Sequence, residues 1–320
     1  MADQEVVKLG PRNDSVLYLQ KDGKHVSIGA WNQINRILKV RKYRDFRDFI
    51  PAEIVGHLRQ AGFYEAALAG SLKLDKVLIS AMVERWRPET HTFHMPFGEC
   101  TITLQDVAVH LGLPIDGNPV TGVTWCDWSE LVEDLLGVVP PASAIKGGGL
   151  KLVWLGEQFN FHNLGGADPI QLMYTARAYI LRLIGTFLLC DHTGSHVPLR
   201  YLILLRDFEE TAKYSWGSAV LALLYHELCY ATGASRTEIG GCAYLIQVWA
   251  WLRIPGIGSD PPRLHRGLPL AARWRDPPPE KPIKWAKKQI EWWRTKLDDL
   301  SSNDVSSLCG CRTLLIFIFI

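Results

Sequence analysis

A run of fourteen residues without a charged side chain, Ile239 to Leu252, constrains the fold of this chain more than any other feature. The run is apolar on every side of a helix, and a helix of that kind is buried. A membrane span needs about 20 apolar residues, so this run is too short to cross a bilayer. We therefore expect a core helix, Glu238 to Leu252, inside a larger helical array.

Further helices are predicted from apolar spacing and from residues that favour helix ends. Asp168 as cap and Pro169 in the first turn predict a long helix to about Leu189. The other expected helices are Pro51 to Ala61 before Gly62, Lys76 to Trp86 after Asp75, Thr103 to Gly112 with Asp106 in a capping box, Asp127 to Leu136 with Glu130, Pro198 to Leu205, Ser215 to Tyr230 and Ile283 to Leu297. The expected fold class is mainly α, a compact multi-helix domain.

A single short region has the pattern of strands instead. Thr92 to Met95 and Cys100 to Ile102 are separated by the turn-forming residues Pro96 to Glu99. This arrangement predicts one small β-hairpin near residues 91–102.

Proline and glycine divide the chain into a helical body and flanking segments. Residues 1–42 are expected to be a loosely ordered lead-in, and residues 43–254 the helical body, with Gly147 to Gly149 as a hinge or internal loop. Eight prolines between Pro255 and Pro282 predict an extended, Pro-rich basic arm over 255–282. Residues 283–300 form a C-terminal amphipathic helix of the same domain, and residues 301–320 an atypical tail.

Composition and charge exclude several classes of protein. Hydrophobic residues make up 48% of the chain and charged residues 21%, which is typical of a folded domain and not of a disordered one. The seven cysteines are scattered, and the first twenty residues lack a signal-peptide apolar core, so we expect a reducing, intracellular setting. Net charge is uneven, because residues 253–296 carry about +7.

The segment Val83 to Val120 reads VERWRPETHTFHMPFGECTITLQDVAVHLGLPIDGNPV. This segment resembles the plant mobile domain family, also labelled aminotransferase-like plant mobile domain, which includes Maintenance-of-Meristems-like proteins and serine/threonine-protein phosphatase 7 long form homologues. Three further blocks agree with the family: Ala176 to Ile184, Tyr214 to Cys229 and Gly241 to Pro255. The resemblance extends from about Tyr43 to Leu300.

The resemblance implies a function that the residue pattern alone does not. It implies a non-enzymatic protein-interaction module in a nuclear complex for meristem maintenance and development, transposon silencing and genome stability. The implied partner is a plant type-7-like serine/threonine phosphatase, nucleic acid is bound indirectly if at all, and no membrane is involved. The nucleus is the implied location and the cytoplasm the alternative. The sequence after Leu300 differs from the continuation that family members have. Residues 301–320 therefore suggest a truncated product or an error in the gene model.

The aminotransferase-like label is not supported by the residues. A pyridoxal phosphate enzyme needs a lysine for the Schiff base, an acid beside the pyridine nitrogen and a large α/β scaffold. Strands alternating with helices are not predicted here, and Lys73, Lys76 and Lys151 occupy ordinary polar helix positions. We therefore predict no catalytic residue and no cofactor, and a degenerate transferase-like enzyme is only the third hypothesis.

Two histidine patterns resemble parts of metal sites. His91 and His94 are three residues apart, so a strand places them on opposite faces unless a bulge intervenes. His226 and Glu227 begin a zinc-protease motif, but position 230 is Tyr230 instead of the second histidine. The sequence predicts no metal site.

The most prominent polar cluster lies between the Lys76 to Trp86 helix and the hairpin. Arginine and tryptophan are common anchors of binding surfaces, so we predict a candidate interaction surface made of Arg85, Trp86, Arg87, Glu89, His91 and Glu99. The alternative role of these residues is a salt-bridged and stacked helix end that joins the hairpin to the helix.

A second candidate surface lies in the basic arm and the helix after it. Arg273, Arg275, Lys287 and Lys288 are interleaved with Trp274 and Trp285. Basic side chains would contact phosphates while aromatic rings stack on bases. The chain would then be a mobile-element-derived nucleic-acid-binding protein, which is the second hypothesis, and a solvated Pro-rich arm is the alternative role of these residues.

Overall fold

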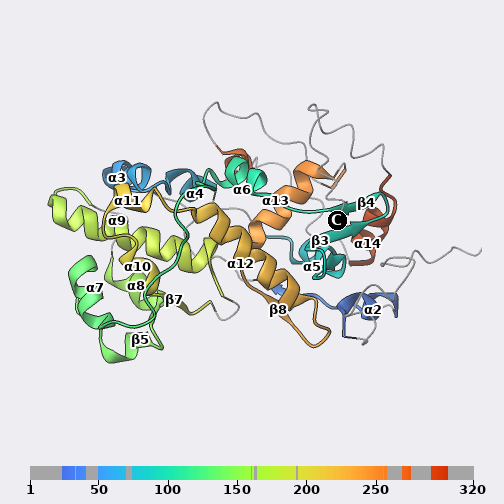
Figure 1. Cartoon of the computed structure of the whole chain (residues 1–320), viewed down its shortest axis with the longest axis horizontal. Coiled ribbons are helices and arrows are strands. Elements are labelled where there is room, and N and C mark those ends of the chain that lie inside the picture. Colours follow the sequence, from blue (N-terminus) through green and yellow to red (C-terminus); the bar gives the residue numbers. More distant parts are fainter. Residues whose placement is uncertain are drawn as a thin grey trace, which may run out of the picture.

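The computed structural model describes residues 24–32, 34–40, 50–69, 74–159, 161, 164–191, 194–254, 256–257, 269–274 and 290–301. Helices dominate these residues, and the strands are short (Figure 1). The fold is mainly α, as predicted from the apolar spacing. Helices α9 and α12 follow one another along the long axis of the molecule, and the other elements pack around them (Figure 1).

The helices at one end of the molecule pack around α9 (Pro169–Leu183), which Asp168 caps and whose last turn continues as a π-helical turn over Ile184–Leu188. The elements in contact with α9 are η2 (Ala52–Ile54), α3 (Val55–Gln60), α7 (Trp128–Leu136), α8 (Leu152–Gln158) and α10 (Arg200–Ile203). Helix α11 (Phe208–Thr211) covers α3.

The other end is organised around α5 (Lys76–Glu84), α12 (Trp216–Ala231) and α13 (Ala243–Arg253). Helix α5 contacts α13, α2 (Val26–Trp31) and α14 (Ile290–Asp298). Helix α6 (Leu104–Leu111) contacts α12, α13, α4 (Tyr64–Ala69) and η5 (Leu270–Trp274). Buried side chains from both ends belong to one continuous core. Within the described residues, no helix is long and apolar enough to cross a membrane.

The predicted hairpin is confirmed as β3 (Thr92–Met95) and β4 (Gly98–Cys100), but the second strand begins two residues earlier than predicted. A third antiparallel strand, β2 (Trp86–Arg87), pairs with β3 and attaches the hairpin to the end of α5. The hairpin is therefore the outer part of a three-stranded sheet with the order β2, β3, β4.

A second three-stranded sheet differs from the sequence prediction. Gly147 and Gly148, expected in a hinge or loop, form the turn of a hairpin between β5 (Ile145–Lys146) and β6 (Gly149–Lys151). Both glycines have positive φ, which suits a two-residue hairpin turn. Strand β7 (His196–Pro198) completes the sheet, so the helix predicted from Pro198 begins only at Arg200.

The predicted core helix also starts later than expected. Glu238 and Ile239 form strand β8, which pairs in parallel with β1 (Lys39–Val40). Gly241 follows with a φ of 67°, and helix α13 begins at Ala243. A pairing with a strand about 200 residues away leaves no signal in the local sequence, so apolar periodicity alone could not place this boundary.

Two segments expected to be unpacked contain packed elements. In the lead-in, the side chains of Val26 and Leu38 are buried, and the Val26 amide donates to the Thr232 carbonyl at 2.7 Å. In the Pro-rich arm, the Tyr244 hydroxyl donates to the carbonyl of the buried residue Ala271 in η5, at 2.9 Å. Most other residues of both segments lie outside the described residues.

The helix-capping predictions are confirmed where local chemistry decides them. The Asp75 carboxylate accepts hydrogen bonds from two amides at the start of α5. Thr103 and Asp106 form a reciprocal capping box at the start of α6, with Asp in place of the usual Glu. Gly112 ends that helix in the left-handed conformation.

Candidate interaction surface

Three of the six residues predicted for the interaction surface are in the interior. Arg85 ends α5, and Trp86 and Arg87 form β2; their side chains are 3%, 0% and 1% exposed. A partner cannot contact these side chains in this conformation, because protein atoms already cover them. The structure favours the alternative role of these three residues, a salt-bridged and stacked helix end.

Trp86 is the centre of an aromatic cluster that joins the sheet to α12. Its ring lies edge-on to Phe93 in β3 and to Tyr225 in α12, with centroid distances of 4.9 and 5.1 Å. Its indole nitrogen donates to the sulfur of Cys229, also in α12, at 3.3 Å. Phe93 in turn stacks on Trp249 of α13 at 5.3 Å. The cluster fixes the hairpin against the two apolar helices.

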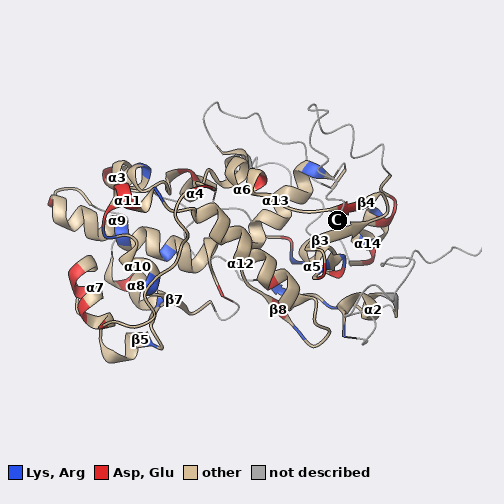
Figure 2. Cartoon of the chain, in the orientation of Figure 1, with Lys and Arg blue, Asp and Glu red and all other residues tan. Residues whose placement is uncertain are grey.

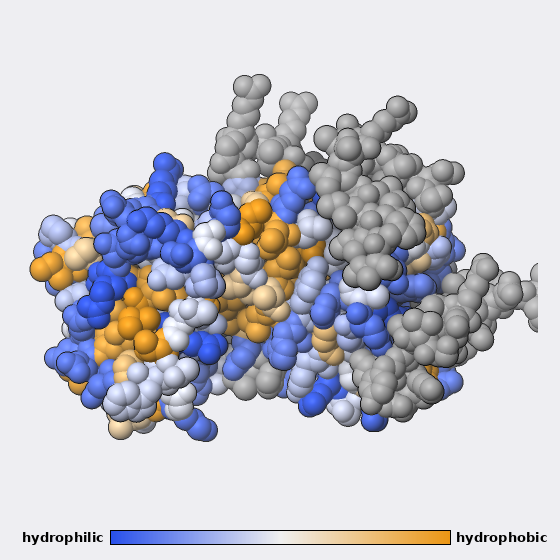
Figure 3. All heavy atoms as spheres, viewed as in Figure 1, coloured by the Kyte–Doolittle hydropathy of each residue, from blue (hydrophilic) through white to orange (hydrophobic). Residues whose placement is uncertain are grey.

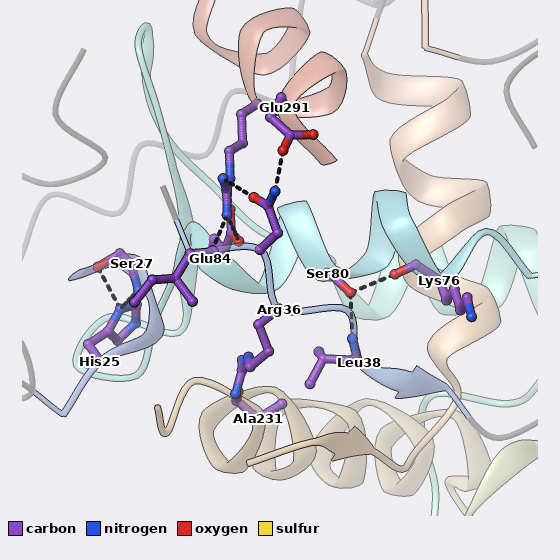
Figure 4. Close-up of polar contacts among 12 residues, drawn as sticks. His25, Ser27, Arg36, Leu38, Lys76, Ser80, Glu84, Ala231 and Glu291 are labelled. Atoms are coloured by element: carbon purple, nitrogen blue, oxygen red, sulfur yellow. Dashed lines mark hydrogen bonds and ion pairs between the residues drawn. The ribbon is translucent and has the colours of Figure 1, made fainter. Parts of the chain in front are cut away.

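Ion pairs attach the C-terminal helix α14 to the end of α5. Both carboxylate oxygens of Glu84 accept from the Arg294 guanidinium, at 2.7 and 2.8 Å. The adjacent Arg85 donates to the Asp298 carboxylate, one turn further along α14. Figure 4 shows Glu84 beneath the start of α14, where Glu291 also projects. The consecutive residues Glu84 and Arg85 therefore pair with Arg294 and Asp298, which lie one turn apart on α14.

Residues 34–36 of the N-terminal segment bind to the same group of helices from another side. Asn35 donates to Glu291 and accepts from Arg294, while Arg294 also donates to the Ile34 carbonyl at 3.0 Å. Arg36 donates to main-chain carbonyls at the end of α12, including that of Ala231 at 2.8 Å (Figure 4). Residues 34–36, α5, α12 and α14 are thus connected through charge-assisted hydrogen bonds.

Burial shifts the pKa values of these charged groups. Loss of water raises the pKa of Glu84, and the hydrogen bonds and charge of Arg294 oppose that shift. Burial lowers the pKa of Arg85 against the effect of Asp298, and it lowers the pKa of Arg87 to about 10. In this interior region Arg85 and Arg294 form ion pairs with Asp298 and Glu84, while Arg36 and Arg87 donate to main-chain carbonyls.

His25 supports the sheet from the N-terminal side. Its Nδ1 accepts the Ser27 amide at 3.1 Å, so the ring proton lies on Nε2, which donates to the Trp86 carbonyl at 2.9 Å. Burial, together with the charge of Arg87, lowers the pKa of His25 to about 3. The imidazole is therefore neutral near pH 7 and acts as a fixed hydrogen-bonding link.

Glu89, His91 and Glu99 remain on the surface. His91 has a φ of 53°, and its ring stacks on Tyr225 with a centroid distance of 5.5 Å. The His91 carbonyl accepts from the Thr101 hydroxyl at 2.8 Å, and Glu99 accepts from the Thr92 hydroxyl at 2.9 Å. These contacts hold the exposed face of the hairpin in one conformation. We call Glu89, His91 and Glu99 the hairpin face.

The other predicted sites are placed as follows. His91 precedes β3 and His94 lies within it, opposite Glu99. Among the described residues, no group of three or more His, Cys, Asp or Glu side chains is arranged to hold a metal ion. The side chains of Arg273, Arg275, Lys287 and Lys288 lie outside the described residues, so the proposed nucleic-acid contacts have no described geometry.

Sequence reasoning missed the residues that complete the interior layer, which are His25, Arg36, Glu84, Arg294 and Asp298. A signal was present in the sequence: an acid and a base, Glu84 and Arg85, end a helix that is otherwise apolar. Such charges seldom lie in the interior without partners. The partners themselves are more than 200 residues away and could not be identified from spacing.

Comparison with known proteins places these features in a family. The family model described as Plant mobile domain matches residues 62–307. A serine/threonine-protein phosphatase 7 long form homolog of Arabidopsis thaliana is 46% identical over 68% of this chain and 17% of its own length. Protein MAINTENANCE OF MERISTEMS is 38% identical over 79% of this chain and 52% of its own, and Protein MAIN-LIKE 1 is 35% identical over 94% and 58%, both from Arabidopsis thaliana.

The chain thus spans between 17% and 58% of the length of these three relatives. No solved structure matches it. The family match covers well over half of the chain and includes α5, the three-stranded sheet of the hairpin, α12, α13 and α14. The chain belongs to the plant mobile domain family.

Proposed function

We propose that this chain is a non-enzymatic protein-interaction module of a nuclear complex that supports meristem maintenance and development, transposon silencing and genome stability. The observation that carries the proposal is the division of residues 85–99 into an interior part and an exposed part. The arginines and the tryptophan hold the hairpin against the helices, while Glu89, His91 and Glu99 are exposed. A surface that is already rigid loses little conformational entropy when a partner binds.

The proposed partner is a plant type-7-like serine/threonine phosphatase. One relative is named as a long form homolog of that phosphatase, and the region matched by this chain is 17% of its length. In that protein, the matched region and a much longer remainder share one chain. We infer that the present chain binds a phosphatase through its hairpin face.

Direct binding of purified proteins tests both the partner and the surface. We expect a plant type-7-like phosphatase to bind the immobilised chain in an interferometry assay. The combined substitutions Glu89→Ala, His91→Ala and Glu99→Ala are expected to weaken this binding at least about tenfold, as the loss of anchoring residues does at other interfaces. Circular dichroism checks that the variant is folded.

Glu157→Ala, an exposed substitution on α8, is the matched control and should bind like the wild type. Failure of the phosphatase to bind the wild-type chain would contradict the proposed partner. Equal binding by the wild type and the triple variant would contradict the hairpin face as its site.

The second candidate function is direct binding of nucleic acid by the basic segment. It is favoured by the net charge of about +7 over residues 253–296. Neutralising Arg273, Arg275, Lys287 and Lys288 should weaken binding to DNA or RNA and reduce its dependence on salt concentration. Gel-shift titrations at two salt concentrations measure this, and unchanged retention would count against the function.

A further inference from the structure

A tryptophan far from the hairpin face is exposed almost completely. Trp125 is 86% exposed and the nearby Val123 is 41% exposed, although most tryptophans of known burial in this chain are in the core. Both lie in the segment between α6 and α7, residues 112–127. An apolar side chain of this size in water is costly, and such positions often serve as anchors for partners.

The segment that carries Trp125 is held firmly against the rest of the molecule. The Asn118 amide donates to the Lys213 carbonyl, and the Asn118 carbonyl accepts the Ser215 amide, each at 2.8 Å. Gly117 packs so closely on Lys213 that a Cβ atom would lie 2.2 Å from its carbonyl oxygen. Gly122 packs similarly closely on Arg200, because a Cβ atom at position 122 would lie 2.7 Å from the Arg200 carbonyl oxygen. Trp125 is thus presented by a fixed main chain.

The sequence around Trp125 is acidic. Between His110 and Lys146 the sequence contains no basic residue. The same stretch contains five carboxylates, all exposed: Asp116, Asp127, Glu130, Glu133 and Asp134.

Two basic side chains near this stretch already have contacts of their own. Arg206 pairs with Asp134 at 2.9 Å, and the guanidinium of Arg200 lies over the ring of Tyr201. In Figure 2, acidic residues colour parts of α7 and of α11 red. Figure 3 shows a patch of apolar surface with polar surface around it. The patch lies in the region that Figure 1 labels α7 and β7.

We propose that the Trp125 surface, made of Val123, Trp125, Asp127, Glu130 and Glu133, docks a Lys/Arg-rich peptide segment of a partner protein that carries an apolar residue. Charge complementarity determines the choice of partner, because the exposed carboxylates attract a basic segment and repel an acidic one. The exposed ring of Trp125 supplies the contact for the apolar residue. This inference rests on the proposed role as an interaction module, but it concerns a surface separate from the hairpin face.

The test uses the full chain and a fluorescein-labelled peptide of sequence Lys-Arg-Lys-Leu-Trp-Lys-Arg-Lys, with anisotropy as the readout. We expect binding that weakens when NaCl is raised from about 50 to about 300 mM. Trp125→Ala should weaken binding at least about tenfold. The charge reversals Glu130→Lys and Glu133→Lys together should weaken it as strongly and reduce the effect of salt.

Val153→Ala, at a 71% exposed position on α8, is the matched control and should bind the peptide like the wild type. A peptide with Ser-Ser in place of Leu-Trp should bind more weakly to the wild type, and equally to the wild type and Trp125→Ala. Because Trp125 is exposed, its replacement leaves the core intact, and circular dichroism verifies this.

Absence of peptide binding by the wild type, or equal binding by Trp125→Ala, would overturn the inference. A change in sedimentation of the chain alone on Trp125→Ala, without a change in peptide binding, would assign the surface to a second copy and also overturn it. The triple variant of the hairpin face should keep its affinity for the peptide. Failure of this inference is therefore distinguishable from failure of the proposed phosphatase binding.

Discussion

Glu84 and Arg294 show, at the scale of single residues, why charges occur in the interior of this domain. Their side chains are 2% and 12% exposed, and each depends on the other for the hydrogen bonds that water would otherwise supply. A buried pair adds little net stability compared with apolar residues, but the loss of one partner leaves an uncompensated charge. The pair therefore specifies how α14 sits on α5.

Arg294→Met is expected to lower the free energy of unfolding by about 3 to 5 kcal/mol, because Glu84 would remain buried without its partner. The double variant Glu84→Gln with Arg294→Met should recover most of this loss. Arg206→Ala, which breaks the exposed pair with Asp134, is the control and should cost less than about 1 kcal/mol. Urea denaturation of the four proteins measures these differences, and equal losses for Arg294→Met and Arg206→Ala would contradict the prediction.

His25 should make the domain sensitive to acid. Its pKa is 6.5 in the unfolded chain and about 3 in the folded one, so the unfolded state binds the proton more tightly. The contribution of neutral His25 is complete above pH 6.5 and is lost as the pH falls towards 3, with a slope of up to about 1.4 kcal/mol per pH unit.

The measurement is the free energy of unfolding of wild type and His25→Gln between pH 7 and pH 4. The wild type should lose stability more steeply on acidification, so the difference between the two proteins should shrink as the pH falls. Parallel curves would show that the pKa of His25 is the same in the folded and the unfolded state, and would contradict the prediction.

At the scale of elements, glycines decide where helices and hairpins can end. Gly137 ends α7 with a φ of 71°, and Gly147 occupies the β5 to β6 turn with a φ of 55°. Their surroundings differ: a Cβ atom on Gly137 would lie 2.3 Å from the ring of Tyr174, whereas none of the atoms around Gly147 would come within 4 Å. Substitutions at the two positions therefore distinguish the cost of a left-handed backbone conformation from the cost of steric overlap.

Gly147→Ala should therefore cost about 1 to 2 kcal/mol of stability, the penalty for a left-handed conformation alone. Gly137→Ala carries the same penalty and must also displace Tyr174, so it should cost at least about 2 kcal/mol more. Thermal and urea unfolding of both variants provide the comparison. A Gly137→Ala variant as stable as Gly147→Ala would refute the overlap described here.

At the scale of the whole molecule, α14 closes one end of the core. Trp293 and Leu297 of this helix are fully buried, while Glu291, Arg294 and Asp298 bond to residues 34–35 and to α5. These contacts join segments from both ends of the sequence, so the domain depends on α14 for a closed core. Loss of the helix would expose apolar side chains and leave Glu84 and Arg85 unpaired.

A chain that ends at residue 289 should therefore unfold at a temperature at least about 10 °C lower than the full chain, because it loses several buried side chains and two ion pairs together. It should also bind a dye specific for exposed apolar surface. A chain ending at Ser301 keeps α14 and is the matched control. Equal melting temperatures for the chain ending at 289 and the control would show that α14 is dispensable.

The sequence by itself determined the helical class, the hairpin, the helix caps at Asp75, Thr103 and Asp168, and membership of the family. The helical class, the hairpin and the caps depend on residues within a few positions of one another, where capping and apolar periodicity act. Family membership depends on four sequence blocks between Val83 and Pro255.

Only the tertiary structure decided which side chains of residues 85–99 are exposed. Arg85 and Arg87 look like surface residues in the sequence, but both are buried. Arg85 pairs with Asp298 of α14, more than 200 residues away, and this partner cannot be identified from the local sequence. The pairing of Glu238 with Lys39, and of Pro198 with Gly149, was likewise set by segments that meet only after folding. Burial and strand pairing depend on chain contacts far apart in sequence, and local patterns carry no record of them.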